Sequence, residues 1–467
     1  MSATLIEQKP RHGTLPVGQD VIFAVSNTSI VSSFTGVKFI AEVHISAGNP
    51  PNPNFSTDIV GTFKTTPNAA GVGMFDFRPI IESFVNPDNI AREGSAYKQP
   101  ANPPSVLNTS DTNVPIHLID RYSGNVNAMR YLFIRFKIEY INTSGELVTT
   151  DIKDSSLYRL FNGYLKYSDI LDLVGNDFGY NLRDFNLNSS TKSFLTNSPS
   201  TQYANLDDYG TFPLLILLDN LEYIKLTYFN SSGSTLGTEN IDKTEANGAF
   251  NTYTGVTEME LLYFGCFPGN LQGSSSTFAG FVTAGSIQGG SIVVQAFDVL
   301  NAEISKEYTI NLNCPTLKGF NPIRLTWLNQ WGAWDYYTFT MKSSKTISTK
   351  GSTYQQLAGS WNGTAYRLDG FKGGKKAFRV NATEKITMNT DFVNESESEW
   401  FEELINSPEV YILEGFQSDI TNSALNTYVT PVRLTTSNYT KKTVANDKLM
   451  QYTFEVEKAK TLRTQSI

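Results

Sequence analysis

The stretch that decides the fold runs from Arg130 to Ile141 and reads RYLFIRFKIEYI. One parity carries apolar side chains and the other carries charged ones: Leu132, Ile134, Phe136, Ile138 and Tyr140 against Arg135, Lys137 and Glu139. Successive side chains of a β-strand point to opposite faces of its sheet. This period of two therefore predicts a strand with one face packed and the other in water.

Similar segments lie on both sides of this stretch. The sequences VGQDVIFAVSN and TGVKFIAEVHIS precede it, and FPLLILLDNLEYIKLTYFNSSG, EMELLYFGCFPGNL and GSIVVQAFDVLNAEISKEYTINL follow it. Their β-branched and aromatic residues between turn formers are typical of strands. In the last of them, a turn at Leu300 to Ala302 predicts a hairpin. The spacing of apolar residues from Tyr164 to Val174 predicts one short helix.

The C-terminal third gives the sharpest predictions. The segment NPIRLTWLNQWGAWDYYTFTMKS contains two alternating runs joined by a turn from Asn329 to Ala333, which predicts an aromatic-rich hairpin. A helix is predicted near 396–406, because Ser396 and Glu399 form a capping-box pattern and Pro408 ends the apolar stripe. Alternation in KLMQYTFEVEKA predicts a final antiparallel strand.

Two proline-rich stretches interrupt these strands, at residues 46–57 and 86–115. Proline removes a hydrogen-bond donor from a sheet, so these stretches are predicted to be long loops. Loops of this length usually contact something, and we expect them to reach neighbouring subunits.

With 467 residues, 40% of them hydrophobic and 18% charged, the chain can bury more than one core. We predict a mainly β protein of two or three antiparallel β-sandwich-like domains with long Pro/Asn-rich loops and one or two short helices. The expected domains are an N-terminal β domain at 1–160, a middle β domain at 161–318 and a C-terminal β domain at 319–467 with the capped helix.

The composition argues against several function classes. A formal net charge of −8 gives no basic footprint for nucleic acid. The three histidines form no HxH or HExxH spacing, and no GxSxG, GxxxxGK[ST] or strand-linked GxGxxG motif occurs. Cys266 and Cys314 lie too far apart to indicate a zinc cluster or a disulfide scaffold. We therefore predict no catalytic residue, no metal and no cofactor.

Membrane insertion is not predicted either. The first residues, MSATLIEQKPRHG, lack the apolar core of a signal peptide. The strongest apolar run, Phe212 to Leu218, is too short to span a bilayer. We expect synthesis in a cytosol.

Paired carboxylates are the alternative that favours an enzyme, because glycosidases need two acids. The candidate groups are Asp207 with Asp208, Glu258 with Glu260, and Glu395, Glu397 and Glu399. A solvated turn, the exposed side of a strand and an acidic first helical turn explain these groups better than catalysis does. A non-enzymatic protein remains the prediction.

Two groups of residues are candidates for contact with a partner or ligand. The segment GFKGGKKAFRV carries Lys372, Lys375, Lys376 and Arg379 around glycines, which fits either a lysine-rich hairpin tip or contact with an acidic partner. In the aromatic hairpin, Trp327 and Tyr337 are assigned to the core. Trp331 and Trp334 at the turn, together with Tyr336, are predicted to be exposed or interface anchors.

Three C-terminal segments together resemble virion structural proteins of tailed phages that infect Bacteroidota, including crAss-like and flavobacterial phages. They are IRLTWLNQWGAWDYYTFTM, the helix that leads into SPEVYILEG, and VANDKLMQYTFEVEKA, with a weaker likeness at TLPVGQDVIFAVSN. The resemblance covers about the last third of the chain. It implies a β-domain protein assembled in a ring or baseplate at or below the portal, without enzymatic activity or cofactor.

Two functions from different classes follow. The first is a structural tail, ring/adaptor or baseplate protein of the virion, whose partners are copies of itself in a cyclic homo-oligomer and other tail or portal-proximal proteins. The second is a receptor- or glycan-binding tail protein whose exposed aromatic side chains contact the host surface. No fixed-period repeat of a fibre shaft occurs, which favours the first.

Overall fold

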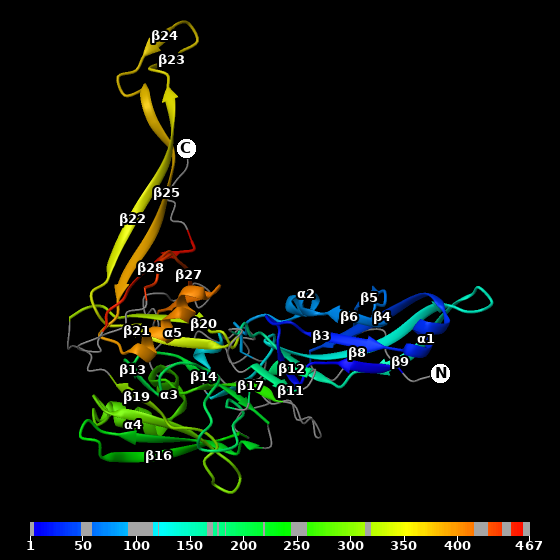
Figure 1. Cartoon of the computed structure of the whole chain (residues 1–467). Helices are drawn as coiled ribbons and strands as arrows, with labels where there is room; N and C mark the ends of the chain where they lie inside the picture. Colours follow the sequence, from blue (N-terminus) through cyan, green and yellow to red (C-terminus); the bar gives the residue numbers. More distant parts are fainter. Residues whose placement is uncertain are drawn as a thin grey trace. The chain divides into compact units, whose positions relative to one another are not determined.

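The computed structural model describes residues 4–47, 58–91, 115–119, 121–165, 171–174, 177–182, 184–217, 220–243, 259–312, 319–414, 428–440 and 450–460. The protein is mainly β, with several antiparallel sheets and few short helices (Figure 1). This agrees with the predicted multidomain β-sandwich-like fold. By its internal contacts it forms two units. Unit 1 is Met1–Pro315, Leu328–Tyr336 and Ser418–Leu425, and unit 2 is Thr316–Trp327, Tyr337–Gln417 and Asn426–Ile467. Unit 1 thus combines residues of the predicted N-terminal and middle domains.

The N-terminal part of unit 1 contains two sheets around one apolar core. The first sheet has the order β1 (Leu5–Gln8), β3 (Ile22–Ser26), β6 (Val72–Asp76). The second has the order β2 (Thr14–Pro16), β10 (Tyr158–Phe161), β8 (Met129–Ile141), β4 (Thr35–Ser46), β5 (Ile59–Thr65), and β9 (Leu147–Asp154) also pairs with β8. Helices α1 (Thr28–Ser33) and α2 (Arg78–Ile81) and the 3-10 turns Glu82–Phe84 and Ile116–Leu118 connect this region.

Strand β8 confirms the predicted strand and its packed face, but its other face is not in water: Phe133 and Glu139 there are buried. All five apolar residues of the predicted packed parity belong to the core, where they contact residues of β3, β4 and β6. On the other parity Glu139 receives a hydrogen bond from Lys64 at 2.7 Å, and Arg135 and Lys137 form ion pairs with neighbouring strands. The charged side of this strand is therefore satisfied by partners across the sheet.

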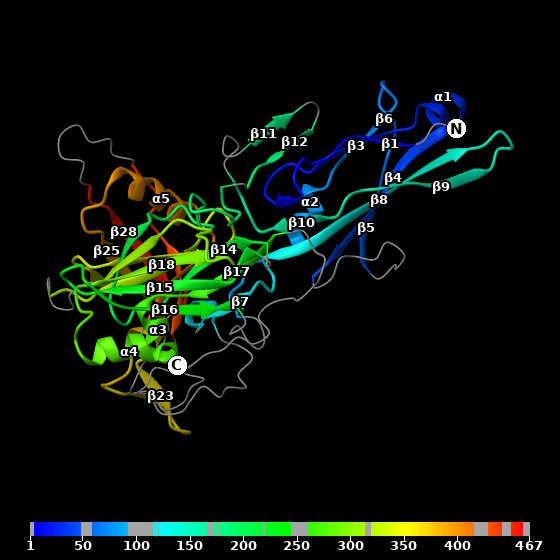
Figure 2. The same ribbon diagram turned by 90° about the horizontal axis from the view of Figure 1, so that it is seen from below.

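The rest of unit 1 contains two further sheets. A five-stranded sheet has the order β13 (Thr201–Ala204), β19 (Tyr308–Leu312), β18 (Ser291–Phe297), β15 (Tyr223–Phe229), β16 (Thr235–Asp242). A three-stranded sheet has the order β14 (Thr211–Ile216), β17 (Glu260–Gly265), β7 (Tyr122–Gly124). Helices α3 (Pro268–Ser274) and α4 (Ser276–Thr283) lie beside them (Figure 2). Phe278 and Phe281 of α4 contact Tyr228 of β15.

The turn predicted between β18 and β19 begins at Asp298. The backbone N–H of Asp298 donates to the Ala302 carbonyl at 3.0 Å, and Asn301 adopts a positive φ of 59°. Asparagine tolerates this left-handed conformation better than most residues. The hairpin prediction for this segment is thus confirmed.

Unit 2 is built on a seven-stranded sheet. Its order is β21 (Trp334–Phe339), β20 (Ile323–Leu328), β26 (Val410–Leu413), β27 (Val429–Leu434), β28 (Thr453–Lys458), β25 (Gly374–Asn389), β22 (Ser344–Gln356). Helix α5 (Glu395–Asn406) covers this sheet, with the Phe401 ring centroid 4.8 Å from Tyr337 and 5.4 Å from Phe454. Strands β23 (Gly359–Trp361) and β24 (Tyr366–Leu368) form a separate small hairpin.

Helix α5 is the helix predicted near 396–406, but its cap lies two residues earlier than expected. The Asn394 side chain accepts a hydrogen bond from the Glu397 backbone N–H, and the Glu397 carboxylate accepts one from the Asn394 backbone N–H. The sequence contains two overlapping capping patterns, and the one that begins with asparagine forms. Asparagine is among the strongest N-cap residues.

The helix predicted over Tyr164 to Val174 is wrong at its C-terminal end. Leu171–Val174 form strand β11, which pairs with β12 (Asp177–Tyr180) in an antiparallel hairpin. A short apolar run does not distinguish helix from strand by its spacing, and here strand pairing decides. Most of the proline-rich stretches at 46–57 and 86–115, like Cys314, lie outside the described residues.

Candidate interaction surface

A long hairpin of unit 2 is the candidate interaction surface. Strands β22 and β25 pair over thirteen positions, but β28 pairs only with Lys385–Asn389 at the base of β25. From Ile347 to Glu384 the hairpin therefore extends beyond the rest of the sheet (Figure 1). We call residues Ile347–Glu384 the arm. Strand β22 is the last strand of its sheet, so the arm consists of two strands and a tip.

The paired register gives the stem of the arm two different faces. Residues directly opposite each other in an antiparallel pair share a face. Val380 lies opposite Gly351 and Ala382 opposite Thr349, on the same face as Ile347. Arg379 lies opposite Ser352 on the other face, next to the pair Lys350 and Asn381. Most apolar residues of the stem therefore lie on one face and most basic residues on the other. Beyond the register shift at Ser352/Thr353, Lys376 lies opposite Tyr354 on the basic face, and Lys375 lies opposite Gln355 on the first face.

The tip of the arm carries large apolar side chains that are exposed. Leu368 is 77% exposed, Phe371 78% and Trp361 67%. Over the whole arm, 8 of the 21 large hydrophobic residues that are exposed in the described part of the chain occur within these 38 residues: Ile347, Leu357, Trp361, Tyr366, Leu368, Phe371, Phe378 and Val380. Contiguous exposed apolar side chains of this kind mark interaction sites in soluble proteins.

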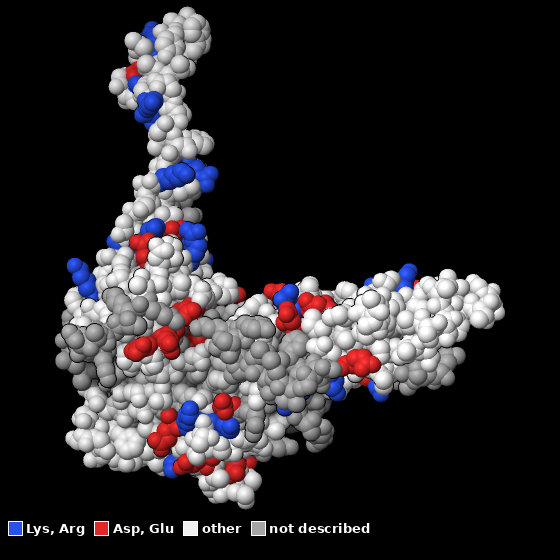
Figure 3. Space-filling view, viewed as in Figure 1, with Lys and Arg blue, Asp and Glu red and all other residues white. Residues whose placement is uncertain are grey.

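The four basic residues selected from the sequence all lie in the arm. Lys375 and Arg379 are exposed, and Lys372 and Lys376 are partly exposed. Lys372 pairs with Asp369 at 2.9 Å and the Lys376 ammonium lies 3.3 Å from the Phe371 carbonyl oxygen, so both contacts stay inside the arm. Figure 3 shows these basic side chains as separate blue groups along the arm.

The prediction that Trp331, Trp334 and Tyr336 are exposed is wrong. The three residues are buried within unit 1, with exposed fractions of 3%, 0% and 3%. The Trp334 indole N–H donates to the Asp88 carbonyl at 2.8 Å, and the Tyr336 hydroxyl lies 2.9 Å from both His117 Nδ1 and Thr211 Oγ1.

The reason for this burial is the close packing of the turn that carries these residues. The backbone N–H of Tyr164 donates to the Gln330 carbonyl at 2.8 Å. Gly332 adopts a φ of 72°, and a Cβ there would lie 2.0 Å from the Asn162 carbonyl oxygen. The hairpin turn itself is confirmed, with hydrogen bonds between Asn329 and Ala333.

The apolar residues of the arm tip were missed by the sequence reasoning. The segment from Gln355 to Gly374 reads QQLAGSWNGTAYRLDGFKGG. Its large apolar residues stand among glycines and asparagine without the period of a packed strand or helix. That combination was the available signal for an apolar loop on the surface.

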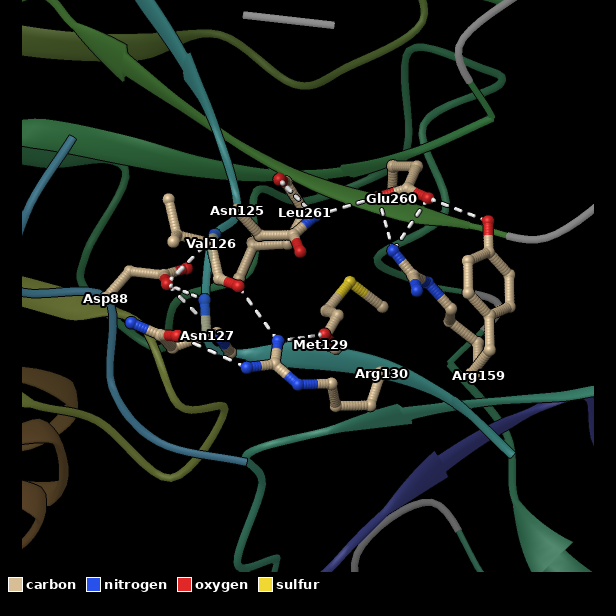
Figure 4. Close-up of polar contacts among 11 residues, drawn as sticks. Asp88, Asn125, Val126, Asn127, Met129, Arg130, Arg159, Glu260 and Leu261 are labelled. Carbon is tan, nitrogen blue, oxygen red and sulfur yellow. Dashed lines mark hydrogen bonds and ion pairs between the residues drawn. The ribbon is translucent and has the colours of Figure 1, made fainter. Parts of the chain in front are cut away.

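A second group of functional-type residues is buried in unit 1, around Asp88 (Figure 4). The Asp88 carboxylate accepts hydrogen bonds from the backbone N–H groups of Val126, Asn127 and Ala128, and one from the Tyr263 hydroxyl at 3.3 Å. Burial raises the pKa of Asp88 to about 6, and these hydrogen bonds oppose the rise. Through these hydrogen bonds, Asp88 connects the segment before β8 to Tyr263 of β17.

Replacing Asp88 by asparagine is expected to change the pH dependence of stability. Because the folded pKa lies above the ordinary value of 3.8, the stabilising contribution of Asp88 is complete below that value and is lost as pH rises through about 6. Relative to Asp88→Asn, the natural chain should lose about 3 kcal/mol of unfolding free energy over this interval. Urea unfolding from about pH 4 to about pH 7 measures the difference, and a pH-independent difference would contradict the raised pKa.

The buried pair of Arg159 and Glu260 lies in the same region. Arg159 Nη2 lies 2.7 Å from both carboxylate oxygens, and the Asn125 amide donates to the same carboxylate at 2.7 Å. The guanidinium carbon lies 4.0 Å from the centroid of the Tyr131 ring. Figure 4 shows Arg159 of β10, Glu260 of β17 and Asn125, which directly follows β7, converging. The pair joins two sheets of unit 1.

The carboxylates considered as paired catalytic acids lie in different parts of the structure. Glu260 is held by Arg159, and the Asp208 carboxylate accepts from the Asn205 backbone N–H at 2.8 Å while Asp207 is exposed. Glu395, Glu397 and Glu399 lie on α5, and Glu258 falls outside the described residues.

Within the described ranges, no three His, Cys, Asp or Glu side chains gather as a metal site would need. No helix in the described part of the chain is long and apolar enough to cross a membrane.

Comparison with known proteins finds little. No protein-family model matches the chain, and no curated protein matches it. Among solved structures, native Escherichia coli alpha-2-macroglobulin is 7% identical with a TM-score of 0.17, covering 82% of this chain and 22% of that one. Salmonella alpha-2-macroglobulin reacted with methylamine is 7% identical with a TM-score of 0.18, covering 96% and 22%. The chain thus spans about a fifth of those proteins, and TM-scores of this size carry no argument about function.

Proposed function

We propose that this chain is a non-enzymatic structural component of a bacteriophage virion: a tail, ring/adaptor or baseplate protein. Its partners in this proposal are copies of itself in a cyclic homo-oligomer and other tail or portal-proximal proteins. In this proposal the protein is located in the virion tail. The likeness of its C-terminal third to phage virion proteins supports the setting, and the arm supports the mode of action.

The single observation that carries the assembly role is the exposure of the arm. A two-stranded hairpin in water is marginally stable at best, and it usually needs a third strand or a packed face. In the described residues the arm has neither from Ile347 outward. Its apolar face and tip gain stability when another molecule covers them. A chain that builds such a hairpin is suited to work through contact with a neighbour.

A receptor- or glycan-binding tail protein is the second candidate. The observation that favours it is the exposure of Trp361 and Tyr366 at the arm tip, 67% and 48% respectively. Aromatic rings of this kind stack on the apolar faces of sugars. A folded monomer whose arm tip binds host glycans would support this candidate, whereas self-association through the tip supports the first.

The tip is expected to contribute strongly to self-association. Replacing Trp361, Leu368 and Phe371 together by serine should weaken assembly by ~30-fold or more, equivalent to about 2 kcal/mol, because buried Trp and apolar anchors dominate interface energy. Size-exclusion chromatography with light scattering over a concentration series measures the change. These side chains are exposed in the monomer, so the variant is expected to fold.

The matched control replaces three exposed hydrophobic residues of unit 1, Tyr203, Val299 and Leu300, by serine. This control should assemble like the natural chain. Equal weakening by both triple variants would show nonspecific hydrophobic association and would contradict an assembly role of the arm. A chain that stays monomeric at all concentrations would contradict the proposed function itself.

A further inference from the structure

The arm differs in charge from the rest of the chain. It carries six basic residues, Lys350, Arg367, Lys372, Lys375, Lys376 and Arg379, against the acidic Asp369 and Glu384. Its formal charge is therefore +4, whereas the whole chain carries −8 and the remaining residues −12. Opposite charge of this kind guides association between two surfaces.

The most concentrated acidic surface of unit 2 is helix α5. Its twelve residues include five glutamates and no lysine or arginine. Trp400, Phe401 and Leu404 bury one side of the helix against the sheet. Glu395 and Glu399 are exposed and lie four positions apart, which places them on one helical face. Figure 3 shows acidic side chains gathered over this helix.

The two charged surfaces are not neutralised within one chain. Among the described residues, Lys350 and Lys375 of the arm and Glu395 and Glu399 of the helix form no ion pair. Of the other basic residues of the arm, Lys372 pairs with Asp369 inside the arm, and Arg379 donates to Asn381 in the same strand. Both surfaces therefore keep charge available for another molecule.

We propose that the arm of one copy binds the acidic face of α5 in the next copy, an inference that rests on the proposed function. The basic face of the stem lies along the Glu395 and Glu399 side of the helix, and the apolar tip buries itself in the neighbour. The stem from Ile347 to Gln356 reaches about 30 Å, enough to span from one subunit to another. Because the two surfaces differ, the contact is heterologous, and its repetition forms the ring of the proposed function when the rotation between copies closes.

An anionic membrane is the competing occupant. Basic residues beside exposed Trp, Phe and Leu also suit the surface of acidic lipids. The formal charge of −12 on the remaining chain opposes approach to such a surface but favours approach of a basic arm. A second copy is therefore the occupant that the charges favour.

Charge reversal on each surface tests the contact. The arm variant combines Lys350→Glu with Arg379→Glu, two exposed residues of the basic face, and the helix variant combines Glu395→Lys with Glu399→Lys. Each variant alone places like charges in the contact and should weaken assembly about tenfold or more at low salt. An equimolar mixture of the two variants restores both contacts and should assemble again, as should one chain with all four substitutions. Sedimentation velocity measures the assembled fraction.

The outcomes separate this contact from the proposed function. Rescue by mixing, with folded single variants by circular dichroism, supports the contact. If both charge variants assemble like the natural chain while the Trp361, Leu368 and Phe371 variant does not, the contact is overturned and the assembly role stands. If the natural chain stays monomeric but sediments with phosphatidylcholine vesicles that contain phosphatidylserine, both are overturned in favour of the membrane.

Discussion

Replacing Glu260 by alanine is expected to reduce the unfolding free energy of unit 1 by about 3 to 5 kcal/mol. The substitution leaves Arg159, which is completely buried, without its carboxylate partner. Two other donors of this guanidinium, Nε and Nη1, already have no hydrogen-bond partner in the described structure. The remaining support would be the ring of Tyr131, which cannot compensate a buried charge.

Hydrogen exchange at increasing urea concentration, followed on peptides from β8 and β17, measures this loss. The matched control is Asp154→Ala, which removes an exposed carboxylate 2.8 Å from Arg135 in the same unit. Exposed ion pairs contribute less than about 1 kcal/mol. Equal effects of the two substitutions would contradict the burial of the Arg159 pair. Joint replacement by Arg159→Met and Glu260→Leu should recover much of the loss, because no charge is then left unpaired.

Replacing Phe401 by alanine is expected to cost unit 2 about 3 to 5 kcal/mol of unfolding free energy. The ring is fully buried and stands at the centre of an aromatic cluster, with centroids 4.8 Å from Tyr337, 5.4 Å from Phe454 and 5.6 Å from Trp400. Removing it leaves a cavity that the surrounding strands cannot close without giving up their pairing. The helix would then lose its main anchor on the sheet.

Phe392→Ala is the matched control, because Phe392 is 59% exposed in the same unit and loses little contact. Its effect should stay within about 0.5 kcal/mol. Urea unfolding with near-ultraviolet circular dichroism reports on both variants, since Trp327 and Trp400 pack in this cluster. If Phe401→Ala unfolds at the same urea concentration as Phe392→Ala, α5 does not pack as described.

The sequence predicted the elements whose signal is local. The alternation from Leu132 to Tyr140 identifies both the strand and its buried face, because a strand presents alternate residues whatever covers them. The Asn329 to Ala333 turn and α5 follow from turn and capping residues in the same way. The two-residue error in the helix cap arose because Asn394 and Ser396 both begin a capping pattern.

The candidate site was predicted only in part, because exposure depends on distant residues. Trp334 looks like a surface residue in its turn, but Asp88 and His117 cover it from more than 200 positions away. The converse holds for the arm, where the strands that carry Ile347 and Val380 would be assigned to a core. Within the part of the chain that the structure describes, the arm has no third strand beside it, and the local sequence pattern does not reveal this. Lys372, Lys375, Lys376 and Arg379 were found because clustered charge near glycines is itself a local signal.

We propose that this chain functions through contact surfaces, with the arm joining one copy to the next. The most direct test is native mass spectrometry of the full chain beside a chain whose residues 349–382 are replaced by Asn-Gly. That replacement closes the paired residues Ser348 and Thr383 with a short hairpin turn and keeps the sheet of unit 2. We predict a single closed oligomer for the full chain and a folded monomer for the shortened one. The same oligomer from both chains, or a monomer from both, would contradict the claim.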